Sequence, residues 1–516
     1  MRKQNYRILR LILGDQLNSQ HSWYKEKSDD ILYVMMECKS ETDYVTHHIQ
    51  KIIGFFASMR QFASSLQEMG HHVYYISLDE SDNTQQIDRN CLALMERYQI
   101  SHFEYQIPDE YRLVQHLEAF TNSLPITFQA YDTEHFFTTQ HELAQFFDGK
   151  GKTLMETFYR YMRKKHNILM KNEGEPLFGK WNFDFDNRKK LPKSHSVVSP
   201  YLFSNDLSKI EDLIKAQGIK SLGVVNSKEF LWPVNRKQSL DLLIFFCNNC
   251  LSLFGSYQDA MDSNYWSVYH SRLSFALNLK LISPNEVIEE AISAYEQSEG
   301  NIGYNQLEGF VRQILGWREY MRGIYWKHMP EYKELNFFNH KRKLPDWFWN
   351  GDTKMKCLHK AISQSNTYAY AHHIQRLMLT GNFALLAGIQ PDEVDDWYLG
   401  IYIDAIEWVE LPNTRGMSQY ADGGIVASKP YISSASYIHK MSNYCESCYY
   451  NHAKKTGDKA CPFNSLYWNF LQSNENKLSS NPRIGMMFKV WQKFSQDQQT
   501  EILHQATFYL NNLNDL

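Results

Sequence analysis

Three features are absent from this 516-residue sequence. No apolar stretch approaches the roughly 20 residues of a membrane-spanning helix, which excludes a membrane partner. The apolar run at residues 8–13 is broken by Arg10 and lacks a cleavage site, which excludes secretion. A large excess of either charge is missing too, because the net charge is −4. The chain is therefore no bulk polycation, and any nucleic-acid contact must be local. We expect a cytoplasmic protein.

The dinucleotide fingerprint G-x-G-x-x-G is also missing after the first expected strand, which excludes NAD bound in the usual way. Strands are expected at residues 7–13, 31–36, 73–78, 103–106 and 126–131, with a long amphipathic helix at 47–69. This alternation predicts a doubly wound parallel sheet, whose ligand would lie at the carboxyl ends of the strands. The polar groups expected there are Asp15, Gln16, Glu41 and Tyr44. Ordinary loop solvation is their alternative interpretation.

The chain is too long for one hydrophobic core, so two or more domains are expected. Residues 1–140 form the predicted α/β domain. Residues 141–230 are irregular and carry scattered Gly and Pro, which indicates a connector. Residues 231–516 follow the helical period and predict an all-α domain, including helices at 311–321, 368–386 and 393–409.

Cysteine is scarce, with eight in all, but three are spaced as C-x2-C-x12-C at Cys445, Cys448 and Cys461. Pro462 follows the last of them, and Cys357 precedes them in the chain. Thiolates at this spacing suit an iron–sulfur cluster or a structural zinc. Disulfides are disfavoured without a secretion signal. Unligated core cysteines remain the other interpretation, because free Cys is often buried.

Polar groups recur along the helical part. Hydroxyls near residues 269–274 open a helical stretch and would suit a diphosphate, although Ser is also a common helix cap. His372 and His373 are adjacent, so they point about 100° apart and one of them can face a ligand. Asp404 and Glu410 flank an aromatic stretch and could bind the hydrogen-donating edge of a flavin. Satisfied core histidines and a plain helix end are the alternatives.

Taken together and in this order, these segments resemble the photolyase/cryptochrome family. Ser271-Arg272-Leu273-Ser274 matches its S-x-L-S segment, Trp317-Arg318-Glu319 its W-R-E helix, and Asp404 its flavin-binding carboxylate. The four cysteines and the H-H-x-x-R segment, His372 to Arg376, are similar to the bacterial iron–sulfur branch of that family. Tyr431 after Asp422-Gly423-Gly424 fits the same branch. The resemblance covers nearly the whole chain.

The resemblance implies FAD, a [4Fe–4S] cluster and a 6,7-dimethyl-8-ribityllumazine antenna. It assigns to FAD the residues His270, Ser271, Arg272, Leu273, Ser274, Gln313, Arg318, Arg376, Asp404 and Glu410. It assigns to the cluster Cys357, Cys445, Cys448 and Cys461, and, loosely, to the antenna Asp15, Gln16, Glu41 and Tyr44. It implies an electron relay through Trp349, Trp397 and Tyr398.

The activity that the resemblance implies is light-driven repair of (6-4) pyrimidine–pyrimidone photoproducts in UV-damaged DNA by electron transfer from excited reduced FAD. His373 would donate a proton, with His372 as second choice, and Glu410 and Tyr431 would share the catalytic site. The residues expected near DNA or the lesion are Asp184, Arg188, Lys189, Lys190, Leu377 and Tyr437. Two positions depart from relatives: Glu410 stands where Asn, Asp or Cys is usual, and Leu377 where animal (6-4) enzymes have His. We expect a monomer.

Two other functions stay open at this stage. A cryptochrome-like blue-light sensor needs the same flavin and relay but repairs nothing. A cluster-containing nucleic-acid binding module, like that of the large primase subunit, would need no flavin at all.

Overall fold

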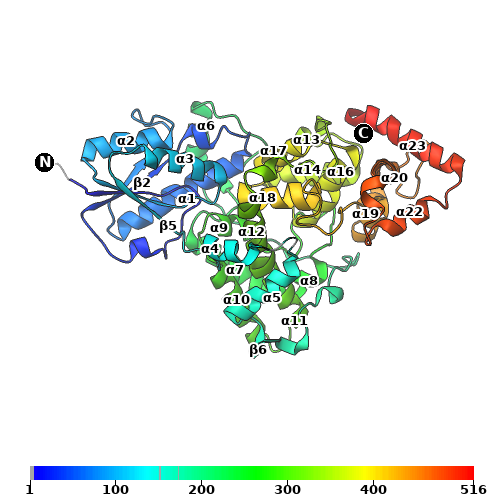
Figure 1. Cartoon of the computed structure of the whole chain (residues 1–516), viewed down its shortest axis with the longest axis horizontal. Helices are drawn as coiled ribbons and strands as arrows, with labels where there is room; N and C mark the ends of the chain where they lie inside the picture. The colour runs from blue at the N-terminus through cyan, green and yellow to red at the C-terminus, as the bar shows by residue number, and fades with distance from the viewer. Residues whose placement is uncertain (1–4, 150, 152, 173) are drawn as a thin grey trace.

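The computed structural model describes residues 5–149, 151, 153–172 and 174–516. Its first part is a sheet of five parallel strands in the order β3-β2-β1-β4-β5 (Figure 1). The strands are β1 (Ile8–Leu11), β2 (Ile31–Met36), β3 (Val73–Ile76), β4 (His102–Gln106) and β5 (Thr127–Tyr131). The predicted strands and their parallel arrangement are confirmed.

Helices cover both faces of this sheet. Alternate strand residues such as Tyr33 and Met35 pack with α1 (Ile49–Glu68) on one face. The intervening residues, such as Val34, pack with α2 (Ile87–Tyr98) and α3 (Tyr111–Asn122) on the other. β2 is buried along its whole length, as expected of a strand with both faces covered. The strand order reverses between β1 and β4, so the crevice of such a fold lies at their carboxyl ends.

The connector is more regular than its sequence suggests. It contains α4 (Gln140–Phe147), α5 (Met155–His166) and α6 (Ser208–Ala216). A capping box between Thr139 and Glu142 begins α4. α5 packs against the helical body, and α6 against α1. The expectation of an irregular segment is therefore wrong for these three helices, whose apolar faces are short but buried.

Helices make up the rest of the chain. They are α7 (Arg236–Asn249), α8 (Leu251–Tyr257), α9 (Ser274–Asn278), α10 (Pro284–Gln297), α11 (Tyr304–Val311), α12 (Glu319–His328), α13 (Trp347–Asn350), α14 (Lys356–Tyr368), α15 (His373–Gln375), α16 (Asn382–Ala387), α17 (Pro391–Ile401), α18 (Glu407–Leu411), α19 (Ala435–Met441), α20 (Pro462–Ser473), α21 (Glu475–Leu478), α22 (Gly485–Trp491) and α23 (Gln496–Asn511). Figure 1 shows α19, α20, α22 and α23 together at the end opposite the sheet. Among the described residues no single helix could span a membrane; α7 and α8 reach the required length and composition only as a pair bent by 73°.

Three short π-helical segments interrupt these helices: η6 (Arg312–Arg318), η8 (Arg376–Gly381) and η9 (Pro412–Ser418). Such turns are rare and frequently lie at functional sites. The continuous helices expected at 368–386 and 393–409 are wrong. The first is broken because Ala369 adopts a left-handed backbone with φ of 51°, and helix resumes at His373. The second ends at Ile401, so Asp404 lies in a loop before α18.

Candidate functional site

The loop between α17 and α18 places one carboxylate at the centre of the helical part. Both oxygens of Asp404 lie within hydrogen-bond distance of Arg376 Nη2, at 2.9 and 3.1 Å. Ser274 Oγ, from the start of α9, donates to Asp404 Oδ2 at 2.5 Å. The Arg376 guanidinium lies 3.7 Å from the centre of the Tyr402 ring. Asp404 and Arg376 are therefore fixed before any ligand binds.

A second carboxylate faces the same arginine. Glu410 Oε2 lies 3.8 Å from Arg376 Nη1, and Thr414 donates a hydrogen bond to Glu410 Oε1. Burial raises the pKa of Glu410, and the positive charge of Arg376 offsets this only in part. Burial by itself would lower the pKa of Arg376, but Asp404, Tyr402 and Glu410 together outweigh it and raise that pKa. Asp404, Arg376 and Glu410 thus form one buried charged group, in which Glu410 holds its proton more readily than an exposed Glu.

Two side chains brace the Asp404 loop from behind. Asn278 Nδ2 donates to the Asp404 carbonyl oxygen at 2.6 Å, and Arg318 Nη1 donates to Asn278 Oδ1 at 2.6 Å. Arg318 also donates to the Leu277 carbonyl oxygen at 3.1 Å and lies 4.7 Å from the Trp408 ring centre. Arg318 therefore reaches the site through Asn278 rather than directly.

The two adjacent histidines lie in different surroundings: one is buried and the other is accessible. His372 is buried, stacks on His270 with ring centres 4.5 Å apart, and has no hydrogen-bond partner for either ring nitrogen among the described residues. His373 is accessible to solvent. Desolvation by the surrounding protein lowers the pKa of His373 to about 4, helped by Arg376 and Arg188. His373 is therefore accessible to solvent yet surrounded by protein, and it is neutral at pH 7.

The segment expected to bind a diphosphate is only partly available. Ser271, Ser274 and His270 remain partly accessible. The side chain of Arg272 is buried and donates to the Tyr201 carbonyl oxygen at 2.8 Å, and Leu273 lies in the core. Gln313 donates to the Gly309 carbonyl oxygen within its own helix at 3.2 Å. The side chains of Arg272, Leu273 and Gln313 are thus engaged in contacts within the protein.

A mouth of mixed charge adjoins His373. Arg188 pairs with Asp184 and lies 3.8 Å from Asp259. Burial raises the pKa of Tyr431 and of Tyr437, and Arg188 acts on both as well as on His373. Three of the residues expected near DNA, Asp184, Arg188 and Tyr437, and the expected catalytic Tyr431 thus belong to one electrostatic neighbourhood with the histidine.

The other three residues expected near DNA lie differently. Leu377 is buried in the core. Lys190 Nζ lies 3.4 Å from the His439 carbonyl oxygen, and Lys189 faces an open groove.

One of the three expected relay aromatics lies at the surface and two lie in the interior. The Trp349 side chain is 46% exposed, whereas Trp397 and Tyr398 are buried. The Trp397 ring centre lies 5.3 Å from that of Tyr398, and Tyr398 lies 5.5 Å from Tyr402, beneath Arg376. Ring contacts thus connect Trp397 to the charged group.

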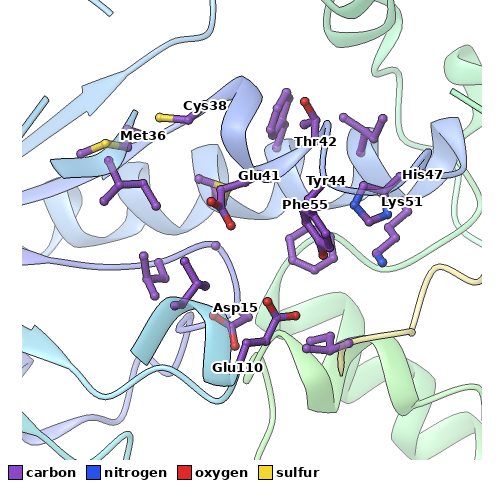
Figure 2. A pocket seen from close by; sticks show the side chains of 18 of the residues that line it. Asp15, Met36, Cys38, Glu41, Thr42, Tyr44, His47, Lys51, Phe55 and Glu110 are labelled. Carbon is purple, nitrogen blue, oxygen red and sulfur yellow. The ribbon is translucent and has the colours of Figure 1, made fainter. Parts of the chain in front are cut away.

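A pocket lies at the carboxyl ends of the strands (Figure 2). It is lined by Asp15, Glu41 and Tyr44, as expected, and also by Ala405 and Ile406 beside Asp404. Gln16 does not line it. Its side chain accepts a hydrogen bond from Leu13 N at 3.0 Å and donates to the Gln106 carbonyl oxygen at 3.1 Å, which ties the end of β1 to that of β4.

Arginine and lysine set the charge of this pocket. Arg112 binds Glu41 at 2.7 Å and lies 4.5 Å from the Tyr44 ring centre. Figure 2 shows Asp15 near Glu110. Burial, followed by Glu407, raises the pKa of Glu110 to about 7. Burial lowers the pKa of Lys51 to about 8 although Glu110, Glu410 and Asp404 oppose it. Lys51 thus lies between the pocket and the charged group.

The four candidate metal ligands line another pocket, in the helical part. Cys357, Cys445, Cys448 and Cys461 all line it and form no disulfide. Among the described residues, no three His, Cys, Asp or Glu side chains stand close enough to hold a single metal ion. Burial raises the pKa of Cys445 to about 11. The four thiols therefore share one pocket, as the spacing of their cysteines predicts.

The sequence can now be placed among known proteins. Over 510 residues it is 39% identical to a (6-4) photolyase from Agrobacterium fabrum, an alignment that covers 98% of this chain and 99% of the relative. The chain belongs to the (6-4) photolyase branch of the photolyase/cryptochrome family. Residues 10–230 also match the family described as deoxyribodipyrimidine photo-lyase-related protein. Photolyases are flavoproteins, so membership implies a flavin cofactor.

Solved photolyase and cryptochrome structures share this fold. A bacterial class III photolyase from Agrobacterium tumefaciens superposes with a TM-score of 0.55 and 15% identity, over 83% of this chain and 81% of that one. A cryptochrome from Synechocystis superposes with a TM-score of 0.53 and 13% identity, over 81% of this chain and 83% of that one.

Several side chains of this photolyase-family site escaped the sequence reasoning. They are Asn278, Tyr402, Thr414, Lys51 and Glu110. One of them had a signal: Asn278 stands four residues after Ser274, on the same helix face. The others reach the site from distant segments whose local sequence is unremarkable.

Proposed function

We propose that this chain repairs (6-4) photoproducts in UV-damaged DNA under blue or near-UV light, with FAD as cofactor. The observation that carries the proposal is 39% identity to a (6-4) photolyase along 98% of the chain. The charged group around Arg376, next to an accessible histidine, supports it.

The residues present fit a flavin. Asp404 offers a fixed carboxylate for hydrogen-bond donors of the isoalloxazine edge, and the hydroxyl of Ser271 suits the diphosphate, whereas that of Ser274 is engaged by Asp404. The unpartnered ring nitrogens of His372 are buried polar atoms that a polar ligand would satisfy. When bound in its reduced form and illuminated, the flavin supplies one electron to the lesion.

The protein's own groups manage protons and position. Glu410, with its raised pKa, can hold a proton in the buried charged group. His373 is neutral in the free protein, so it can donate a proton only after its pKa rises. Bound phosphates would raise it, because a nearby negative charge favours the imidazolium. We therefore infer that DNA binding itself protonates His373, which can then act as the acid.

A damaged base must leave the duplex stack to reach His373 and the flavin, at a cost of a few kcal/mol. Arg188, Lys189 and Lys190 would receive the phosphates at the mouth, and Tyr431 and Tyr437 would contact the extruded bases. Trp349, Trp397 and Tyr398 would bring electrons inward to reduce the flavin.

Two further groups are proposed. The pocket lined by Asp15, Glu41 and Tyr44 would hold a ribityl-lumazine antenna beside the Asp404 loop. The four cysteines would hold a [4Fe–4S] cluster, because their thiols share one pocket and four thiolates are the ligand set of such a cluster. Free thiols fit the reducing cytoplasm, and we propose that the chain works there as a monomer.

A repair assay tests the function. The purified protein is reduced and incubated with an oligonucleotide that carries one (6-4) product, in darkness or under blue light. We expect loss of the lesion only in the light, with the original bases restored. His373→Ala should retain flavin yet lose repair. Persistence of the lesion in illuminated, flavin-loaded protein would overturn the proposal and favour a light sensor.

A further inference from the structure

An open groove on the connector shares only Lys189 with the proposed mechanism. It is lined by Phe178, Phe183 and Phe185, with Lys180 and Lys189 at its edges. The Phe185 side chain is 99% exposed and that of Phe178 is 65% exposed. The groove encloses about 610 Å³, within the range that ligand sites occupy. Neighbouring large apolar side chains left in water mark a site that something else covers.

The groove is held in shape by the helical body. The ring centres of Phe178 and Phe183 lie 4.6 and 5.0 Å from that of Tyr304, which begins α11. Phe178 adopts a left-handed backbone with φ of 58°, which a bulky residue keeps only where its surroundings enforce it. Asn305, which also lines the groove, donates from Nδ2 to Asn187 Oδ1 at 2.8 Å. Figure 1 shows α5, α11 and β6 gathered in this part of the molecule.

Positive charge surrounds the aromatic floor. Lys180 Nζ lies 5.8 Å from the Phe183 ring centre. Next to the groove, Arg160 and Lys164 lie 5.4 and 5.6 Å from the ring centre of Trp181. Asp186 also lines the groove, where its carboxylate can accept from a base amino group. Aromatic rings between lysines form the kind of platform on which proteins stack unpaired bases.

The groove is next in the chain to the residues of the proposed lesion site. Lys189 lines the groove, and its neighbour Arg188 acts on His373 and Tyr431. Hydrogen bonds from Arg188 N to the Gly255 carbonyl oxygen at 3.1 Å, and from Lys189 N to that of Ser256 at 2.7 Å, fix this junction. One strand of DNA can therefore touch both places.

We propose that the groove binds an unpaired, undamaged nucleotide next to the lesion on the same DNA strand, with its base stacked on Phe185 and Phe178 and its phosphates beside Lys180 and Lys189. This inference rests on the proposed function, because the strand that binds in the groove is the one whose damaged base enters the lesion site. The groove would give this chain an affinity for single strands that does not depend on damage.

Binding to an undamaged, fluorescein-labelled oligothymidylate, measured in the dark by anisotropy with the full-length protein, tests the proposal. Phe185→Ala should weaken binding by about 5- to 150-fold without changing the salt dependence. Lys189→Gln should instead lower the slope of log affinity against log salt by about one. The matched control is Phe508→Ala, since Phe508 is 56% exposed on α23, and it should bind like the wild type. Both phenylalanines are exposed, so neither change should unfold the protein.

Equal affinity of Phe185→Ala and Phe508→Ala for the oligonucleotide would overturn the proposal. It would also be overturned if the wild type formed dimers at high concentration and Phe185→Ala did not, because the groove would then bind a second copy. The repair assay reports separately on the proposed function. Wild-type protein that binds through Phe185 but leaves the lesion intact under light would contradict the repair function and leave the nucleotide groove standing.

Discussion

Arg376 combines three contacts that one residue type alone can make. Its guanidinium binds the Asp404 carboxylate, faces Glu410 and stacks on Tyr402. A lysine would keep the charge, but it lacks both the planar fork and the stacking face. The identity of this side chain, rather than its charge, therefore determines the geometry of the charged group.

Arg376→Lys should accordingly lose flavin affinity by about 10- to 100-fold, the range expected for one charged hydrogen bond. The measurement is the dissociation constant of FAD from refilled apoprotein, with flavin retained after purification as a second readout. Arg236→Lys is the matched control, because Arg236 binds Glu286 through two nitrogens at a remote site. Similar losses in both variants would show that the effect is general destabilisation.

His48 predicts a dependence of stability on pH. It begins α1, its backbone N–H donates to the Gly400 carbonyl oxygen at 2.8 Å, and its ring lies 2.9 Å from the Asn366 carbonyl oxygen. Burial lowers the pKa of His48 to about 4. Above about pH 6.5 both folded and unfolded imidazoles are neutral, so the group contributes nothing there. As the pH falls towards 4, the unfolded chain takes up a proton that the folded chain refuses, and stability is lost.

His48→Gln removes this titration. Between pH 7 and pH 5 the variant should lose about 2 kcal/mol less unfolding free energy than the wild type, as the shift from about 6.5 to about 4 implies. Urea unfolding at the two pH values, followed by circular dichroism, gives the difference. His504→Gln changes an exposed histidine of α23 and should follow the wild type. Parallel losses in His48→Gln and the wild type would contradict the prediction.

At the scale of elements, hydrophobic periodicity predicted the strands and the long helix α1, but it did not predict where the helices of the C-terminal part are interrupted. The continuous apolar run of β2 and the helical stripe of α1 lie entirely within their own segments, so the sequence shows them. The break before Asp404 does not, because Ile403, Ala405 and Ile406 continue a helical pattern. Its cause is partners that lie far away in sequence, Ser274 and Asn278, which bind the Asp404 carboxylate and carbonyl.

The cysteine pocket joins elements that otherwise touch little. Cys357 comes from α14, whereas Cys445, Cys448 and Cys461 surround the loop between α19 and α20. Their spacing in the sequence predicted a shared site, because short C-x-x-C runs converge locally. It could not show the width of the site, since that depends on where α14 packs.

Cys357→Ala should abolish iron binding, from about four atoms in each chain to none, because a cluster that loses one of four thiolates is no longer held. It should also lower the melting temperature by loosening the loop after α19. Iron and acid-labile sulfide assays on anaerobically purified protein provide the measurement. Cys247→Ala, in the buried face of α7, is the control and should keep its iron. Stoichiometric zinc in the wild type would contradict the cluster.

At the scale of the whole molecule, the protein itself fills one part of the crevice where the strand order reverses, beside the pocket of Figure 2. Lys280, just beyond α9, inserts between the ends of β1 and β4. Its Nζ lies 2.7 Å from Asp109 Oδ2 and 3.1 Å from Asp15 Oδ2, and its side chain is 1% exposed. Burial alone would lower the pKa of Lys280, but Asp109 and Asp15 outweigh it and raise it. This triad connects the sheet to the helices, and composition gave no hint of it.

Lys280→Met should therefore destabilise the folded chain by about 3–5 kcal/mol, because Asp15 loses its cation and Asp109 keeps only Arg322, 4.0 Å away. A second change, Asp109→Asn, should recover part of that loss by removing one stranded charge. Thermal and urea unfolding of both variants supply the measurement, and Lys237→Met, at an exposed position of α7, is the control. Because Asp15 also lines the pocket proposed for the antenna, Lys280→Met should shift ligand binding there as well. Stability equal to that of Lys237→Met would mean that apolar packing, and not this ion triad, joins the two parts of the molecule.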